Sequence, residues 1–424
     1  KEREAGGGRA HTDATLRLFG HSEDDVRLTL YRDKAAWCPY CQKVWIMLEE
    51  KKIPYRISHI NMRSYGHKPD WFLAKVPGGL LPAIELDGKT YTESLEIMRL
   101  IDQEFPDNKP VFYPAGEARR IQELYQLERN LFAGWCEYMF RPERVRLEGL
   151  FSRVDSELGK AWEQSGKTSP WFLGGEAPSL IDLQFITHVE RMEASLAYWK
   201  AMRIRGAGGG AQPHWPHLER WMEAFEAREA YQATKSDYYT HVMNIPPQYG
   251  YAYPDVSSNY EEVRDAVSFI GGESWNLPRD SCWEPIRPPF QRSEEAARHE
   301  AAFELASNYE SIVKFACRGT GDRGEINFSA PLADPYALAN PAEKEDVDLL
   351  LRMTAQGLVR GQLPQFEAGG LDAERREELA KCIKYVRDRV GVPRDMSFPA
   401  AQHLRAYLNH IVDILVPLDG SSSA

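Results

Sequence analysis

Apolar residues recur in the first hundred positions with the spacings of strands and amphipathic helices. Val26, Leu28 and Leu30 alternate with other residues, which predicts a strand, and residues 42–52 carry apolar side chains along one helical face. A second strand is expected at 55–60. After a polar, glycine-rich start, the chain therefore continues as a strand, a helix and another strand.

The next apolar runs predict a hairpin and a closing helix. Residues 80–86 lead into a third strand, Asp87 and Gly88 form a two-residue turn signal, and residues 89–91 return beside it. Residues 93–105 then show the periodicity of a helix. This order of elements, β-α-β, a connection and then β-β-α, is that of a thioredoxin-like domain.

Beyond this first domain the pattern becomes helical. Residues 116–140 predict one long helix, and Ser179 and Asp182 stand in the Ser-x-x-Asp arrangement that begins a helix. Residues 246–290 interrupt the pattern, and their richness in proline and aromatic residues favours an ordered strap over a flexible linker. Helical periodicity returns over 293–417, which predicts a small bundle of amphipathic helices.

These patterns predict a multidomain chain in which an α/β domain precedes all-α parts. At 424 residues the chain is too long for one ordinary core. We expect a disordered tail at 1–24, a thioredoxin-like domain at 25–106, an all-α domain at 115–245, the aromatic and proline-rich strap at 246–290, and an extra helical extension at 291–424.

Composition and charge narrow the choice of partners. The net charge of −11 disfavours nucleic acids and anionic membrane surfaces as general partners, and no apolar run approaches the length of a membrane-spanning helix. Six cysteines in so long a chain are too few for a disulfide framework, which favours a reducing compartment. Because the chain begins without Met, we expect a processed end from which any targeting segment has been removed.

The clearest chemical motif is Cys38-Pro39-Tyr40-Cys41, placed between the first strand and the first helix. A helix N-terminus favours an anion, so the Cys38 thiol should ionise readily and act as a nucleophile. Cys41 lies one turn further on, where it can serve as a resolving thiol. A zinc site would need a second pair of ligands with similar spacing, which the sequence lacks, so thiol chemistry is favoured. An iron–sulfur cluster shared between subunits is the remaining metal alternative.

With these motifs the chain resembles the cysteine-containing glutathione transferases. It is similar to their omega and glutaredoxin-like classes and most similar to the iota class of photosynthetic organisms, because that class also carries a helical extension. The residues that carry the resemblance are Cys38-Pro39-Tyr40-Cys41, Lys68-Pro69-Asp70-Trp71, Leu81-Pro82 and Glu93-Ser94. The Ser-x-x-Asp arrangement described above also begins the central helix of the all-α domain in this family.

The resemblance implies a glutathione site on the first domain. In this family the cysteine faces the glutathione sulfur, and the residue before a cis-proline, here Leu81 before Pro82, pairs through its backbone with the cysteinyl part. Glu93 and Ser94 would hold the γ-glutamyl end, and Lys68 would approach the glycyl carboxylate. Their chemistry is suitable, because the carboxylates and the ammonium group of glutathione need a cation, a helix N-terminus and a carboxylate.

The predicted site therefore has three parts and no metal ligands. Its residues are, for catalysis, Cys38 and Cys41; for glutathione binding, Trp37, Pro39, Tyr40, Lys68, Leu81, Pro82, Glu93 and Ser94; and, for a second substrate in a cleft beside the all-α domain, Tyr125, Arg129, Trp135 and Tyr138.

The leading hypothesis is a glutathione-dependent thiol transferase that removes glutathionyl groups or reduces disulfides, with dehydroascorbate reduction as adjacent chemistry. Glutathione would be the co-substrate, and the other substrate would be a small disulfide, glutathionylated or apolar compound. The alternative hypothesis is a non-catalytic ligand-binding or carrier protein that keeps its glutathione site. The resemblance further implies a chloroplast stromal location and a homodimer formed through the first two domains.

Overall fold

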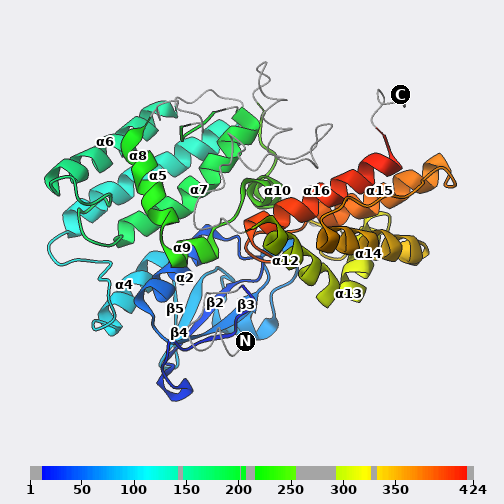
Figure 1. Cartoon of the computed structure of the whole chain (residues 1–424). Helices are drawn as coiled ribbons and strands as arrows, with labels where there is room; N and C mark the ends of the chain where they lie inside the picture. The colour runs from blue at the N-terminus through cyan, green and yellow to red at the C-terminus, as the bar shows by residue number, and fades with distance from the viewer. Residues whose placement is uncertain are drawn as a thin grey trace. The chain divides into compact units, whose positions relative to one another are not determined.

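The structure is a computed structural model that describes residues 12–141, 147–200, 202–206, 215–254, 293–325 and 332–417. The chain divides into two compact units. The first comprises Lys1–Lys235 with Ala252–Asp255, and the second comprises Ser236–Tyr251 with Val256–Ala424. Figure 1 shows the elements of both units, coloured from the N-terminus to the C-terminus. None of the described helices combines the length and apolar character needed to cross a bilayer.

The first unit contains a five-stranded sheet in the order β1-β3-β2-β4-β5. The strands are β1 (Leu16–Arg17), β2 (Leu28–Asp33), β3 (Tyr55–Ile60), β4 (Ala83–Leu86) and β5 (Lys89–Thr92). Strands β2 and β3 run parallel, whereas β4 pairs antiparallel with both β2 and β5. This confirms the predicted thioredoxin-like topology and makes β2, which leads into the Cys38 motif, the central strand.

Helix α2 (Pro39–Lys51) follows β2 and carries the cysteine motif. It begins at Pro39, whose missing N–H needs no partner in the first turn, and ends before Lys52, which takes a left-handed conformation. The short elements around the sheet are η1 (Glu23–Asp25), η2 (Arg63–Tyr65), α3 (Asp70–Lys75) and α4 (Ser94–Glu104). Nearly every residue of α2 is buried, because the helix packs on the sheet, on α4 and on the helical part of the same unit.

That helical part confirms the predicted all-α region. Its helices are α5 (Ala118–Phe140), α6 (Glu148–Gln164), α7 (Leu180–Lys200), α8 (Pro216–Glu226) and α9 (Glu229–Thr234). Helix α7 is central, since it is buried along almost its whole length and contacts both α2 and α5. The predicted cap is present, because Asp182 accepts hydrogen bonds from the backbone N–H (2.7 Å) and hydroxyl (2.6 Å) of Ser179.

The start of the chain differs from the predicted disordered tail over residues 12–24. Strand β1 pairs with β3, and Arg17 donates two hydrogen bonds to the buried carboxylate of Glu49, at 2.9 and 2.7 Å. A buried charge needs such a partner, so this ion pair anchors β1 to helix α2, which carries Glu49. Residues 1–11 of the predicted tail lie outside the described residues.

The second unit is a helical bundle, as predicted for the extension. Its elements are α10 (Tyr238–Tyr249), α12 (Glu294–Ser307), α13 (Tyr309–Ala316), η3 (Cys317–Gly319), η4 (Pro341–Glu343), α14 (Lys344–Arg360), α15 (Ala373–Arg387) and α16 (Phe398–Leu415). Helix α16 packs against α12, α14 and α15 around one apolar core.

Helix α10 belongs to this bundle, whereas the sequence placed it at the end of the all-α domain and the start of the strap. Asp237, at its N-terminus, forms a fully buried ion pair with Arg405 of α16. This long-range partner has no local signal in the sequence. The rest of the predicted strap, beyond residue 254, lies outside the described residues.

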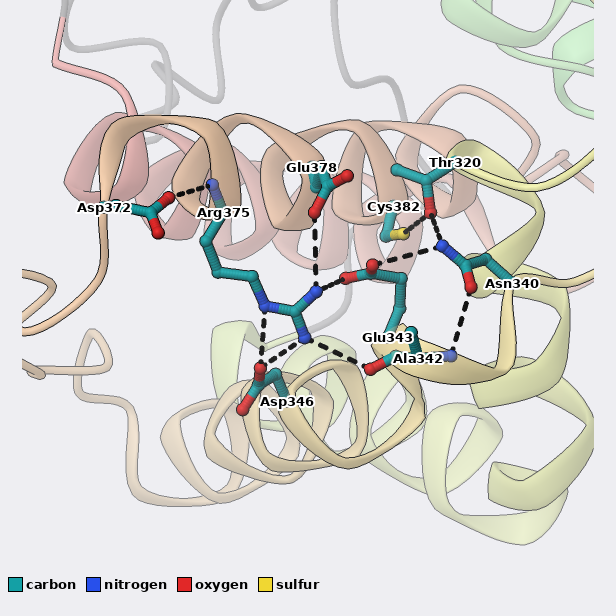
Figure 2. A network of polar contacts seen from close by, with 9 residues as sticks. All are labelled: Thr320, Asn340, Ala342, Glu343, Asp346, Asp372, Arg375, Glu378 and Cys382. Atoms are coloured by element: carbon teal, nitrogen blue, oxygen red, sulfur yellow. Dashed lines mark hydrogen bonds and ion pairs between the residues drawn. The ribbon is translucent and has the colours of Figure 1, made fainter.

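A network of polar contacts ties α15 to η4 and α14 in the second unit (Figure 2). The Arg375 guanidinium contacts carboxylate oxygens of Glu343 and Asp346, each at 2.6 Å, and donates to the Ala342 carbonyl at 3.2 Å. Its backbone N–H is capped by Asp372 at 2.8 Å. Glu343 is almost fully buried, so its charge depends on this arginine.

Replacing Arg375 by Met is therefore expected to destabilise the second unit by about 1–3 kcal/mol, because a buried carboxylate loses its main partner. Hydrogen exchange of α14 and α15 peptides in the full-length protein measures this change. The matched control is Arg352→Met, which breaks a pair that lies near the surface with Asp348 and should change the protection little, because water screens such pairs. Equal protection in the two variants would contradict the role given to Arg375.

Candidate active site

Cys38 is the N-cap residue of α2, and Cys41 lies in the first turn. Both are buried in the structure. The carboxylate of Asp33, the last residue of β2, accepts hydrogen bonds from the backbone N–H groups of Trp37 (2.6 Å) and Cys38 (3.1 Å). The carboxylate of Asp33 and the two sulfurs lie within 4.8 Å of one another. Among the described residues this group has three members, one fewer than a closed structural zinc site uses.

The two thiols differ in their tendency to ionise. A hydrogen bond from the Cys41 thiol holds the pKa of Cys38 below its usual value, although burial and the Asp33 carboxylate oppose this. Burial raises the pKa of Cys41 well above its usual value, and the neighbouring Cys38 adds to this. The arrangement therefore makes Cys38 the nucleophile and leaves the proton on Cys41.

Helix α7 reaches the cysteine motif from the opposite side. Arg191, which is buried, donates to the backbone carbonyl of Trp37 and to Gln42 Oε1, the latter at 2.9 Å. Gln42 in turn donates to Glu190 at 3.0 Å and to the Thr234 carbonyl at 3.3 Å. The turn that holds Cys38 is thus fixed by side chains from the helical part of the same unit.

Lys43 adds a buried cation one turn further along α2. Its Nζ donates to Gln184 Oε1 of α7 at 2.5 Å and lies 4.7 Å from the centre of the Tyr40 ring. Burial lowers the pKa of Lys43 to about 8, against the attraction of the Glu128 carboxylate. The Cys38 thiolate also favours the charged lysine, so the two groups interact electrostatically.

Tyr40 faces a second polar group formed by α5 and α7. Glu128 receives a hydrogen bond from His188 Nδ1 at 2.7 Å and two from Arg129, each at 2.6 Å. Arg129 also lies 3.5 Å from His188 Nδ1, and the His188 ring meets the Tyr40 ring edge-on with centres 5.3 Å apart. The middle of the cysteine motif is therefore held against this Glu128–Arg129–His188 group.

Lys68 lies close to the thiols. Its Nζ donates to the Asn61 carbonyl at 2.9 Å, and burial lowers its pKa while Cys41 and Cys38 oppose that change. A Cβ built at Gly79 would stand 3.4 Å from Lys68 Cδ, so the lysine packs on the loop that precedes Leu81. The Leu81–Pro82 peptide bond is cis. The structure thus brings Cys38, Lys68 and this loop together.

Glu93 and Ser94 begin α4 directly after β5, whose last residue, Thr92, pairs with Ala83 beside Pro82. Glu93 is exposed and has a φ of 67°, which is unusual for a residue other than glycine. Its carbonyl accepts the first helical hydrogen bond, from Ile97 N at 2.9 Å. Ser94 stands in the first turn of α4. A strained backbone at an exposed helix start is the kind of feature that accompanies ligand sites.

The four residues predicted for a second substrate separate into two groups. Arg129 belongs to the Glu128–Arg129–His188 group that faces Tyr40, and its guanidinium lies 5.7 Å from the centre of the Tyr125 ring. Trp135 differs from the prediction, because it is buried in the helical core and donates to Ser195 Oγ at 2.9 Å. Tyr138 stands nine residues beyond Arg129, about 13 Å along α5, where it lies beneath Lys200.

Sequence reasoning missed the residues that support the thiols. Asp33 could have been found, because a carboxylate at the end of an apolar strand and five positions before a reactive cysteine is unusual. Arg191 and the Glu128–His188 pair have no such signal, since their partners are 60 or more positions away in the sequence.

The Glu128–His188 pair makes stability dependent on pH. Burial lowers the pKa of His188 to about 4, more than the Glu128 carboxylate raises it. Below pH 6.5 His188 is protonated in the unfolded chain but stays neutral in the folded chain. The free energy of unfolding therefore falls as pH drops from 6.5 to 4. Burial raises the pKa of Glu128, but its interactions with His188 and Arg129 outweigh this and lower the pKa to about 2, so the contribution of Glu128 is lost at still lower pH.

We therefore expect His188→Gln to lose less stability than the original protein between pH 7 and pH 5. Glutamine can still donate to Glu128 but does not titrate, and the measurement is the urea midpoint of tryptophan fluorescence at both pH values. An unchanged pH dependence in the variant would show that His188 titrates normally in the folded protein.

Comparison with known proteins agrees with this geometry. Residues 37–104 match the family model described as glutathione S-transferase, N-terminal domain. Glutathione S-transferase L1 of Arabidopsis thaliana is 29% identical over 205 residues, which are 47% of this chain and 79% of the relative. Glutathione S-transferase DHAR2 of the same plant is 26% identical over 200 residues, 47% of this chain and 84% of the relative. Over roughly its first half the chain is therefore similar to glutathione S-transferases, including relatives named DHAR2 and L1.

Among solved structures, glutathione transferase Omega 3C from Trametes versicolor is 26% identical, with a TM-score of 0.43, and covers 53% of this chain and 90% of its own. The relatives thus account for about half of this chain. The stretch matched to the family model begins one residue before Cys38 and contains every residue predicted to bind glutathione. Asp33 and Arg191 lie outside that stretch.

Proposed function

We propose that this protein is a glutathione-dependent thiol transferase in which Cys38 is the nucleophile. The observation that carries the proposal is the pair of buried thiols at the start of α2, whose pKa values are shifted in opposite directions. A thiolate attacks disulfide sulfur, whereas a glutathione-conjugating enzyme needs a hydroxyl that activates bound glutathione without joining to it. Cysteine at this position therefore favours exchange over conjugation.

The proposed reaction has two exchange steps. The Cys38 thiolate attacks the glutathionyl sulfur of a mixed disulfide, so that the substrate sulfur leaves as a thiolate and takes a proton from solvent. Cys38 then carries a glutathionyl group through a disulfide bond. A second glutathione thiolate attacks that glutathionyl sulfur, which forms glutathione disulfide and restores the Cys38 thiolate. The substrate gains two electrons, and two glutathionyl units are joined.

Glutathione would lie along one side of the domain. Lys68, half-buried beside the thiols, offers a cation to the glycyl carboxylate, and the backbone of Leu81 offers pairing to the cysteinyl part. Glu93 and the N-terminus of α4 offer a carboxylate and N–H groups to the γ-glutamyl end. The left-handed backbone of Glu93 supports this assignment, because such strain is retained where a ligand uses it.

The finer affiliation and the location are also proposals. The helical second unit supports a place near the iota class, and with it a plastid location in a photosynthetic organism. Dehydroascorbate is proposed as a further acceptor, since a thiolate can attack its carbonyl carbon before a second thiol completes the reduction. Glutathione, rather than a bound metal, supplies the electrons in each case.

The test is turnover with glutathione as the only reductant. The mixed disulfide of glutathione with 2-mercaptoethanol is added, and formation of glutathione disulfide is followed through glutathione reductase. We expect saturable turnover that depends on both glutathione and enzyme concentration. If neither this substrate nor dehydroascorbate is reduced above the uncatalysed rate, the proposed function is wrong.

A further inference from the structure

The peptide that joins Trp37 to Cys38 is held by opposite charges from two parts of the first unit. The Asp33 carboxylate accepts both N–H groups of this pair, at 2.6 and 3.1 Å, from the end of the central strand. The Arg191 guanidinium donates to the Trp37 carbonyl from α7 and lies 5.1 Å from the centre of the Trp37 ring. The backbone N–H groups of Trp37 and Cys38 thus bind an anion, and the Trp37 carbonyl binds a cation.

Both charged groups are removed from water. Asp33 is 1% exposed and Arg191 is 2% exposed. Interactions between charges are stronger in such surroundings than at the surface, so each group acts on the Cys38 sulfur with little screening. The carboxylate opposes a thiolate on Cys38, and the guanidinium favours one.

Arg191 also holds the turn that follows Cys38. It donates to Gln42 Oε1 at 2.9 Å, and the backbone N–H of Gln42 donates to the Cys38 carbonyl at 3.0 Å. The arginine therefore contacts the chain on both sides of the nucleophile. A side chain that only filled space in the core would not need this set of contacts.

Other ionisable groups surround the cysteine motif and contribute to any pH profile of Cys38. Those on α2 and on the segment after η2 are Tyr40, Cys41, Lys43 and Lys68. Those on α5 and α7, which contact the motif or its neighbours, are Glu128, Arg129, His188 and Glu190. Asp33 and Arg191 act in a more direct way, through hydrogen bonds to the Trp37–Cys38 segment itself.

We propose that Asp33 and Arg191 are a pair of positioning residues that hold the Trp37–Cys38 peptide from opposite sides and set the nucleophilicity of Cys38 in opposite directions. This inference rests on the proposed function for its importance in catalysis, but the pair acts on the free thiol. Its effect can therefore be measured without glutathione or any substrate.

The experiment measures how fast iodoacetamide alkylates Cys38 as a function of pH, with the modified residue identified by peptide mapping. Asp33→Asn keeps the shape and removes the negative charge, so its profile should move to lower pH by about one unit. Arg191→Met removes the positive charge, so its profile should move to higher pH by a similar amount. One unit corresponds to about a tenfold change in rate at a fixed pH below the transition.

Two further variants separate this role from a loss of structure. Arg191→Lys keeps the charge and should return most of the way to the original profile, and Arg191→Gln replaces Arg191→Met if the latter does not fold. Lys51→Met is the control. Lys51 is a buried cation that pairs with Asp102 at 2.7 Å, and it lies at the C-terminal end of α2, about 18 Å from the start of that helix. Its replacement should leave the alkylation profile of Cys38 unchanged.

Shifts of the alkylation profile in opposite directions for Asp33→Asn and Arg191→Met support the inference. If these shifts are found but no transferase activity is, only the proposed function fails. Shifts in the same direction, or profiles that coincide with that of the original protein while turnover is normal, overturn the inference and leave the proposed function standing.

Discussion

Cys38→Ser is expected to lose glutathione-dependent reduction of mixed disulfides, with kcat/KM lower by roughly 10³-fold or more, as when other covalent nucleophiles are removed. A serine hydroxyl at the start of α2 is similar in size to the thiol and suits the N-cap position, but it does not ionise near neutral pH and forms no disulfide. The measurement is the coupled assay with glutathione and the 2-mercaptoethanol mixed disulfide, at the same glutathione concentration for both proteins.

Cys41→Ser is the matched control for this prediction. Its hydroxyl can still donate a hydrogen bond to the Cys38 sulfur, which is the main reason that the pKa of Cys38 is low. Turnover should therefore fall by less than about tenfold, since free glutathione resolves the intermediate. Full activity in Cys38→Ser, or its complete loss in Cys41→Ser alone, would reverse the roles assigned to the two residues.

Asp182→Ala is expected to cause the largest loss of stability, about 3–5 kcal/mol, because it leaves several buried donors without an acceptor. The carboxylate is fully buried at the start of α7 and accepts from Ser179, from Phe172 N at 3.1 Å and from Trp221 Nε1 at 2.8 Å. Tryptophan fluorescence during urea unfolding measures the loss, because Trp221 and other buried tryptophans of this unit become exposed when it unfolds.

Asp155→Ala provides the comparison. Asp155 also caps a helix in the same helical part, where it accepts from His217 N at 2.8 Å and Leu218 N at 2.9 Å. Its surroundings are only partly buried, so water can replace it and the cost should be about 1 kcal/mol. The account of α7 as the buried centre of the helical part would be wrong if the two variants lost equal stability.

Local patterns predicted the elements that place the thiols. The alternation around Leu28 and Leu30 gave β2, the apolar periodicity after Cys38 gave α2, and Ser179 with Asp182 gave the start of α7. These signals lie within a few residues of one another, because hydrophobic periodicity, proline preference and capping are local effects. The thioredoxin-like order and the following helices could therefore be predicted before any contact was known.

What could not be predicted depends on contacts between distant segments. Arg191 and Glu190 are two of several buried polar residues of α7, and their bonds to Trp37 and Gln42 have no signal in the local sequence. The sequence alone does not show whether Trp135 lies in a core or at a binding site, because aromatic residues occur in both. Its burial and its hydrogen bond to Ser195 place it in the core. Strand β1 is two residues long, which is too short for a recognisable pattern.

The central claim is that Cys38 accepts and returns a glutathionyl group, and the most direct measurement follows that group on the protein. Cys41→Ser is mixed with glutathione disulfide, quenched with acid and mapped by peptide mass spectrometry, and glutathione is then added to a second sample. The account predicts one glutathionyl group, on Cys38, which added glutathione removes at least as fast as steady-state turnover. A glutathionyl group found on Cys136 instead, or one on Cys38 that glutathione removes more slowly than turnover, would contradict it.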